Sequence, residues 1–188
     1  MDEPEFIERV LSNPVNREIL HLLSAAGLPD AWLTSGALLQ TVWNSLTGRA
    51  PSYGIKDYDI FYFDGADLSW EAEDYAMKAA QQVFAPIGAD IEIRNQARVH
   101  LWYEEKFGIA YPQLHKATDG IDNFLATSAM VAVQPDGEGG FNVYAPAGLD
   151  DIAKMRLRPN RQHAKPDLYT AKMAQYQQTW PELEIEGL

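Results

Sequence analysis

Cysteine is absent from this chain of 188 residues. Without thiols there is no disulfide framework and no thiolate metal site, so the fold must rest on a hydrophobic core. The four histidines are scattered, and no two of them have the i, i+4 spacing of a zinc-binding helix. These absences exclude a disulfide-rich fold and argue against a zinc site.

Positive charge is scarce, because 15 lysines and arginines face 27 aspartates and glutamates, for a net charge of −12. Such a charge repels nucleic acid phosphates at long range, which disfavours a large RNA or DNA partner. One basic run interrupts this pattern: Lys154, Arg156, Arg158, Arg161, His163 and Lys165. It fits a solvated face, and it equally fits a site for a triphosphate or an anionic acceptor.

Long apolar runs are also missing, and no stretch approaches the roughly 20 residues that a membrane span requires. The N-terminal residues 1–5 are acidic, whereas a signal peptide begins with basic residues. We therefore expect a cytoplasmic protein without membrane contact. With 46% hydrophobic residues, the chain suits one compact domain, or one small domain plus a helical tail.

The most informative segment is 56–64, in which Asp57 and Asp59 lead into aromatic and β-branched residues typical of a buried strand. Two residues apart on a strand, these carboxylates share a face, with their Cα atoms roughly 6.5–7 Å apart. Such a pair repels unless a cation lies between, and Mg²⁺ or Mn²⁺ suits oxygen ligands near phosphates. The alternative is a solvated turn in which the aspartates cap backbone amides.

A candidate phosphate-binding turn precedes this segment. After a short strand at 32–33, Ser35 and Gly36 open a helix predicted over 36–47, which Gly48 ends. We expect Ser35 to cap the helix and Gly36 to allow close approach of a ligand. The free amides of a helix N-terminus bind phosphate well. The order is therefore strand, small-residue turn, helix, and then Asp-x-Asp on a strand.

This order resembles the nucleotidyltransferase superfamily, the fold of DNA polymerase β and of the tRNA CCA-adding enzymes. The layout from Ser35-Gly36 to Asp57-Tyr58-Asp59 resembles the CCA-adding head in particular. Further stretches are similar to a bacterial group of uncharacterised nucleotidyltransferase-like proteins, over about residues 30 to 183: 95–103, 144–151, 158–160 and 180–181.

The resemblance implies an α+β fold, with a mixed β-sheet flanked by helices and with helices at both termini. It also implies that Asp57 and Asp59 bind Mg²⁺ or Mn²⁺, and that a third acid on a later strand completes the site. Glu92, between two isoleucines, is our preferred third acid, and Asp90 is the alternative. A strand with a polar solvent face also explains both.

The implied reaction transfers a nucleoside monophosphate from a nucleoside triphosphate to a small-molecule or protein acceptor and releases pyrophosphate. Glu92 would act as a metal ligand or as general base. The arginine that CCA-adding enzymes place after the turn is missing here, where the chain has Leu39-Gln40. We expect Arg49 or Lys56 to bind the nucleotide instead. If neither does, the domain binds a nucleotide or a partner without turnover.

We expect one domain over 1–188, with N-terminal helices in 1–28, a catalytic core in 29–145 and a C-terminal helical tail in 146–188. Proline should break the first helical region at Asn13-Pro14. Ser69 should cap a helix over 70–85. The other predicted elements are strands at 58–64 and 89–95, a hairpin of 128–134 with 141–144, a short helix from 148, and a last helix at 166–179.

Some side chains are candidates for contact with a base. Stacking rings are offered by Trp43, Trp102, Tyr103, Tyr144 and Trp180. The amides of Asn95 and Gln96 have the donor and acceptor pattern that reads a base edge. Core packing explains the aromatic residues equally well, and the end of a strand explains the two amides.

Overall fold

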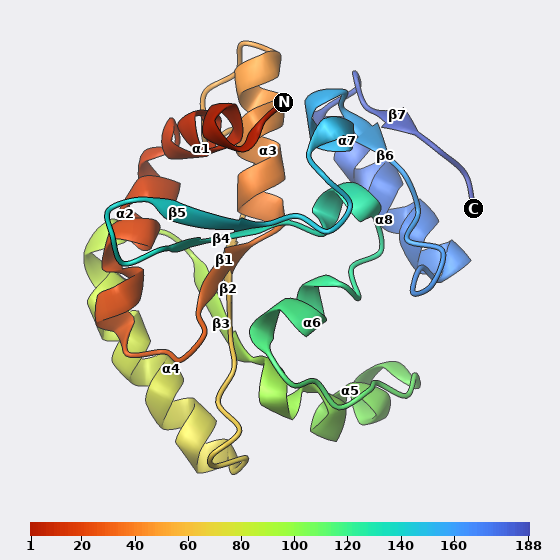
Figure 1. Cartoon of the computed structure of the whole chain (residues 1–188). Coiled ribbons are helices and arrows are strands. Elements are labelled where there is room, and N and C mark those ends of the chain that lie inside the picture. Colours follow the sequence, from red (N-terminus) through yellow and green to blue (C-terminus); the bar gives the residue numbers. More distant parts are fainter.

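The structure is a computed structural model that describes all 188 residues (Figure 1). Its α-helices are α1 (Glu3–Leu11), α2 (Pro14–Leu22), α3 (Gly36–Leu46), α4 (Trp70–Phe84), α5 (Val99–Phe107), α6 (Ala117–Ile121), α7 (Asp150–Ala153) and α8 (Pro166–Thr179). Short 3₁₀ turns are η1 (Leu23–Ala26), η2 (Ala85–Ile87), η3 (Gln96–Arg98) and η4 (Thr127–Ala129). The strands are β1 (Trp32–Thr34), β2 (Tyr58–Tyr62), β3 (Ile91–Asn95), β4 (Ala132–Pro135), β5 (Phe141–Tyr144), β6 (Arg156–Leu157) and β7 (Glu184–Ile185).

Five strands form one mixed sheet in the order β3-β2-β1-β4-β5. β2 and β3 are parallel, and α4 provides the crossover that a parallel pair requires. The remaining neighbours are antiparallel, including the predicted hairpin of β4 and β5. The α+β class with a mixed sheet flanked by helices is therefore confirmed.

The N-terminal helices begin where their local sequence predicts. The Asn13 side chain accepts a hydrogen bond from the amide of Val15, and Pro14 opens α2. Ser69 caps α4 by accepting a hydrogen bond from the amide of Ala72.

None of the helices has both the length and the apolar content that crossing a membrane requires.

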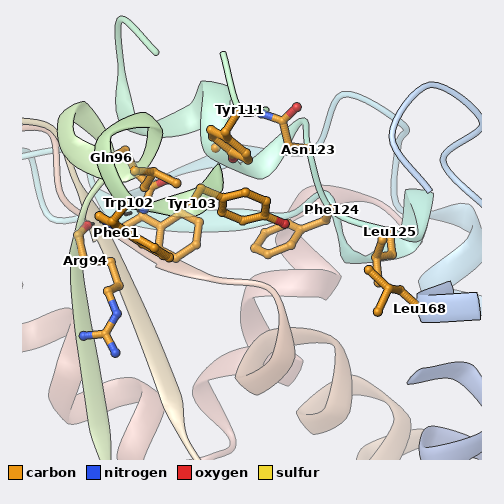
Figure 2. Close-up of a pocket in the computed structure, with 12 residues that line it drawn as sticks. Phe61, Arg94, Gln96, Trp102, Tyr103, Tyr111, Asn123, Phe124, Leu125 and Leu168 are labelled. Carbon is orange, nitrogen blue, oxygen red and sulfur yellow. Dashed lines mark hydrogen bonds between the residues drawn. The ribbon is translucent and has the colours of Figure 1, made fainter. Parts of the chain in front are cut away.

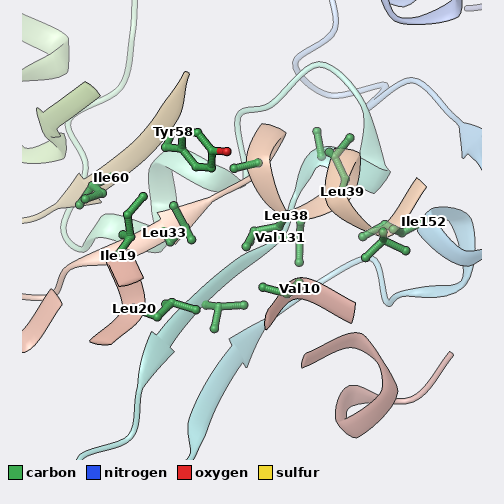
Figure 3. Packing of buried hydrophobic residues seen from close by; sticks show 14 of the residues in the cluster. Val10, Ile19, Leu20, Leu33, Leu38, Leu39, Tyr58, Ile60, Val131 and Ile152 are labelled. Carbon is green, nitrogen blue, oxygen red and sulfur yellow. The ribbon is translucent and has the colours of Figure 1, made fainter. Parts of the chain in front are cut away.

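One face of the sheet carries the main core. On β2, Tyr58, Ile60 and Tyr62 are buried, because alternate side chains point to the same face. Helices α1, α2 and α4 cover this face, and Figure 3 shows Val10 of α1 and Ile19 of α2 packed toward the strands. Burial of these side chains holds β2 rigidly, which fixes the residues on its other face.

The opposite face is only partly covered. Residues of α6 pack there on Trp32 and Ala132 in a small second cluster. Figure 1 shows α5, α6 and α8 on this side of the sheet. Because Asp59 and Phe61 alternate with the buried residues of β2, they point to this less crowded face. The fold therefore leaves one end of the face free for a site.

The C-terminal part differs from the expected helical tail over 146–188. It contains α7 and α8, but it also contains the two-stranded parallel sheet of β6 and β7. Each of these strands has two residues, too few for an alternating pattern to be detected. An ion pair of 3.2 Å between Arg156 and Glu184 joins them. The tail is thus a mixed segment.

Helix α8 is fixed to α3 by aromatic packing just beyond its C-terminus. The rings of Trp43 and Trp180 meet edge to face with centroids 5.5 Å apart. The indole Nε1 of Trp180 donates a 2.8 Å hydrogen bond to Oδ1 of Asn44. This contact holds the C-terminal end of α8 against the C-terminal part of α3, and Lys172, Met173 and Tyr176 of α8 lie across from the start of α3.

Candidate functional site

The predicted turn and the predicted acids meet in one cavity of about 190 Å³. Asp57 immediately precedes β2, Asp59 lies within it, and both line the cavity beside Ser35 and Gly36. The register of the sheet explains this meeting, because Thr34 of β1 pairs with Asp59 of β2. The sequence therefore predicts correctly that these four residues lie together.

The conformation of Ser35 departs from the prediction that its side chain caps the helix. Its φ is +41° and its ψ is −102°, and its side chain forms no capping hydrogen bond. The capping prediction is wrong because a bond of 2.8 Å from the Ser35 amide to the Val131 carbonyl ties the turn to the segment before β4. The first amides of α3 are left without a side-chain cap, as an anion site requires. Strain of this kind is often found at functional sites.

Asp59 is held in a destabilising environment. Burial, together with the negative charges of Asp57 and Glu92, raises its pKa from 3.8 to about 6. Arg94 and Lys172 act in the opposite direction but do not compensate. A cation placed between these carboxylates would remove the repulsion.

The third carboxylate is near this pair but outside the cavity. Glu92 of β3 pairs in register with Asp59 of β2, and its side chain is 44% exposed. Its carboxylate forms a 3.0 Å ion pair with Arg94. Asp90 lies before β3 and is exposed. The chain contains no group of three histidine, cysteine, aspartate or glutamate side chains close enough to share a metal ion.

Helix α8 supplies the opposite wall through Lys172, Met173 and Tyr176. Burial, together with the charges of Asp59 and Asp57, raises the pKa of Tyr176 to about 12. A hydrogen bond with Gln40 has the opposite effect. The tyrosine is therefore a neutral, half-buried wall of the cavity at physiological pH.

Lys172 is the only lysine or arginine that lines this cavity. It is exposed on α8, with its ammonium 5.1 Å from the centre of the Tyr176 ring. Sequence reasoning missed it, because a single lysine in a polar helix carries no local signal. Only the packing of α8 against α3 brings it to the acids.

The cations expected from the sequence are elsewhere. Arg49 does not line the cavity, and it forms a 2.9 Å ion pair with Glu182 beside the Tyr53 ring. Lys56 is exposed and also lies outside the lining. In the basic run, four members form ion pairs with acidic neighbours: Lys154, Arg156, Arg158 and Arg161. This run therefore forms a charge-paired surface.

A second cavity of about 250 Å³ adjoins the first (Figure 2). Trp102 and Tyr103 of α5 line it together with Gln96. Phe124 and Leu125 line both cavities, so they form a shared wall. Two of the five candidate stacking rings and one of the two candidate amides thus lie beside the acidic site.

The other candidates for base contact have structural roles. Trp43 and Trp180 are 0% and 1% exposed in the core, so they cannot stack on a ligand. The Tyr144 hydroxyl donates a 2.7 Å hydrogen bond to Asp122. The Asn95 amide donates to the carbonyl of Asp64, and its oxygen accepts from two backbone amides.

A buried ion pair fixes the connection between β3 and α5. Glu73 of α4 binds Arg98, and it also accepts a 3.1 Å hydrogen bond from the amide of Asn95. Removing one partner of such a pair is costly, because it leaves an uncompensated buried charge. The pair therefore holds α5, with Trp102 and Tyr103, in place over the end of the sheet.

Comparison with known proteins agrees with this geometry. A family model described as nucleotidyltransferase matches residues 21–185. A structure determined by NMR and described as revealing a CCA-adding enzyme head domain is similar, with a TM-score of 0.78 and 23% sequence identity. The match covers 100% of this chain and 97% of the other. No curated protein matches the sequence.

Proposed function

The chain belongs to the nucleotidyltransferase family, and from this premise we propose that it transfers a nucleoside monophosphate from a nucleoside triphosphate to an acceptor, with a divalent metal ion. The observation that carries the proposal is the meeting of Asp57 and Asp59 with the Ser35-Gly36 turn in one cavity. A turn that binds phosphate and carboxylates that bind a cation are the two parts that such chemistry needs.

The triphosphate is held at the start of α3. The uncapped first turn offers backbone amides, and Gly36 has no side chain to block their approach. Lys172, from the opposite wall, supplies the positive charge that the sequence lacks at Leu39-Gln40. The phosphates thus lie between α3 and α8.

The carboxylates fit a hard divalent cation such as Mg²⁺ or Mn²⁺. Two carboxylates share the cavity, and the pKa of Asp59 is raised by burial and, in addition, by the like charges of Asp57 and Glu92. When bound, the ion neutralises phosphate charge and lowers the pKa of an attacking hydroxyl. Asp57 and Asp59 hold it and orient the phosphate beside them.

Glu92 accepts the proton from the acceptor hydroxyl. It is next to Asp59 across the β2–β3 pair, on the side away from the Ser35-Gly36 turn. To act, its carboxylate must exchange the ion pair with Arg94 for contact with the acceptor. Asp90 precedes β3 and does not pair with Asp59, which favours Glu92 of the two candidates.

The acceptor is a small molecule or a protein. The description of the similar structure, a CCA-adding enzyme head domain, makes a nucleic acid the competing candidate for the acceptor. The net charge of −12 opposes it, and the ion pairs of the basic run leave little free positive surface. A small or uncharged acceptor avoids this repulsion.

A second candidate function is nucleotide binding without turnover. It is favoured by the engagement of Glu92 with Arg94 and by the lack of a three-acid group. In that case the carboxylate pair would still bind a metal and a triphosphate. Pyrophosphate release separates the two functions.

The test combines calorimetry with a pyrophosphate assay, using each of the four nucleoside triphosphates with and without Mg²⁺ or Mn²⁺. The variants are Asp57→Asn/Asp59→Asn and, as control, Asp167→Asn, an exposed aspartate at the start of α8. Metal-dependent binding that the double variant loses and the control retains is expected. Glycerol is supplied as a hydroxyl acceptor beside water, so that the nucleoside monophosphate can be transferred. Pyrophosphate release supports transfer, and its absence supports the second function. No binding by the wild type would overturn both.

A further inference from the structure

The second cavity has walls built of aromatic rings, and we call it the aromatic cavity: Phe61, Trp102, Tyr103, Tyr111 and Phe124, with Gln96 at one side. We propose that it binds the base of the nucleoside triphosphate whose phosphates lie at the Ser35-Gly36 turn. This inference rests on the proposed function and adds to it the place where the base is held.

The rings of the cavity are only partly buried, unlike those of the core. Trp102, Tyr103 and Tyr111 are each half-buried, and the centroids of the two tyrosine rings are 4.4 Å apart. In Figure 2 the ring of Tyr103 lies between Trp102 and Phe124. Partly exposed ring faces stack on bases, because every base has a π-face. The walls therefore suit a flat heterocycle.

Polar groups are few and stand at the edge of the rings. Gln96 is 2% exposed, and its Nε2 has only a long contact of 3.5 Å to the Arg94 carbonyl. Asn123 donates to the Asp119 carbonyl at 2.9 Å, and it also lines the cavity. An amide with a weak partner can exchange it for the edge of a base. A side-chain amide has both a donor and an acceptor, which match the acceptor and donor at the edge of a base.

The aromatic cavity is continuous with the acidic site along one face of the sheet. Phe61 follows Asp59 by two residues on β2, so their Cα atoms are roughly 6.5–7 Å apart on that face. Phe124 and Leu125 line both cavities. A ribose spans a distance of this order, so one nucleotide can place its α-phosphate at Asp59 and its base beyond Phe61.

The volumes support a shared occupant. The two cavities measure about 190 and 250 Å³. Sites for small molecules usually have about 300–1,000 Å³, so each cavity alone is small and the two combined lie within this range. A nucleoside triphosphate is too large for either cavity alone.

Charge fixes the direction in which the nucleotide lies. The aromatic cavity has one cation in its lining, Arg94, whose charge is paired with Glu92. Figure 2 shows the Arg94 guanidinium extending away from the rings. The phosphates therefore lie toward Lys172 and α3, and the base lies toward Tyr103.

The experiment compares affinities for the four nucleoside triphosphates and for inorganic tripolyphosphate, in the presence of Mg²⁺. The variants are Tyr103→Leu and Trp102→Leu, with Tyr103→Phe as the conservative variant. Tyr75→Leu is the matched control, because this tyrosine is 77% exposed on α4. Thermal melting of each variant verifies that it folds.

We expect the two leucine variants of the cavity to weaken binding of at least one nucleoside triphosphate about tenfold, which is the lower range for loss of one stacking ring. Tyr103→Phe and Tyr75→Leu should bind it as the wild type does. Affinity for tripolyphosphate should change in none of them, since it has no base. This combination would support the proposal.

Two results would overturn the inference while leaving the proposed function in place. One is unchanged nucleotide affinity in both Tyr103→Leu and Trp102→Leu, while Asp57→Asn/Asp59→Asn abolishes binding. The aromatic cavity would then not hold the base of the nucleotide. The other is an equal loss for nucleotide and tripolyphosphate, which would mean an effect on the phosphate site. Failure of the wild type to bind any of these probes would overturn the inference and the proposed function together.

Discussion

Replacing Asp59 by asparagine should stabilise the metal-free protein at neutral pH, although it removes a proposed metal ligand. Burial and the neighbouring Asp57 and Glu92 raise the pKa of Asp59 from 3.8 to about 6. A difference of about two pH units between the unfolded and folded pKa corresponds to about 3 kcal/mol of free energy of unfolding. This is an upper value, because the chain relaxes around a buried charge.

The sign follows from where the proton is bound. Between about pH 4 and pH 6 the folded protein keeps a proton on Asp59 that the unfolded chain has lost. The contribution of Asp59 to stability therefore falls as pH rises through this range, and the full loss is present above it. Asparagine cannot ionise, so the variant escapes this loss.

The assay is thermal melting of wild type and Asp59→Asn at pH 4 and pH 7.5, without divalent metal. For a chain of this length, about 3 kcal/mol corresponds to a rise in Tm of about 6–12 °C at pH 7.5, with little difference at pH 4. Other carboxylates titrate in the same range, so the difference between the two proteins is the measured quantity. Asp167→Asn is the control and should melt as the wild type does.

Adding Mg²⁺ should reverse the order, because a cation bound only by the folded state raises stability by mass action. The wild type should gain Tm and Asp59→Asn should gain little. If the variant melts at or below the wild type in metal-free buffer at pH 7.5, the like charges do not destabilise the site. Repulsion between Asp57 and Asp59 would then not favour a cation between them.

Three further variants test other parts of the site. Lys172→Met should weaken tripolyphosphate binding about tenfold, measured by calorimetry, while its melting temperature stays unchanged. The control variant, Lys78→Met on α4, should bind tripolyphosphate as the wild type does. Equal effects of the two substitutions would exclude a specific role for Lys172. Glu92→Gln should reduce the rate of pyrophosphate release about hundredfold or more while nucleotide affinity is retained, and Asp90→Asn should release pyrophosphate at nearly the wild-type rate. A larger loss of rate in Asp90→Asn than in Glu92→Gln would assign the proton acceptor to Asp90. Trp180→Ala should lower the free energy of unfolding by about 3 kcal/mol in urea denaturation, because the Trp180 side chain is only 1% exposed and packs on Trp43 of α3. A loss below about 1 kcal/mol would mean that other contacts hold α8 in place.

The sequence predicted those parts of the site that local chemistry determines. Alternation on β2 predicts that Asp59 points to the face away from the buried Ile60, and the small residues at the start of α3 indicate the turn. The conformation of Ser35 was beyond such reasoning, because its positive φ accompanies a hydrogen bond to Val131 in a distant segment. The alternation likewise placed Glu92 on the correct face without revealing its ion pair with Arg94.

The cationic part of the site could not be predicted in the same way. Arg49 and Lys56 were expected at the nucleotide because they are close in sequence to the acids. The packing of Trp180 on Trp43 brings in Lys172 instead, and no local pattern encodes a contact between helices so far apart along the chain. Charge complementarity at this site is a property of tertiary structure.

The alternation of β2 also explains how the fold tolerates an unfavourable site. Ile60 and Tyr62 anchor the strand in the main core on the other face of the sheet. The repulsion at Asp59 can therefore persist without unfolding the sheet, and it supplies a driving force for cation binding. The same strand then carries Phe61 into the aromatic cavity, at the next position on that face. The two faces of β2 thus differ: one packs into the core, and the other carries a proposed metal ligand and one wall of the proposed base site. Substitution of Ile60 should accordingly lower the melting temperature, substitution of Phe61 should lower ligand affinity, and substitution of Asp59 should change both.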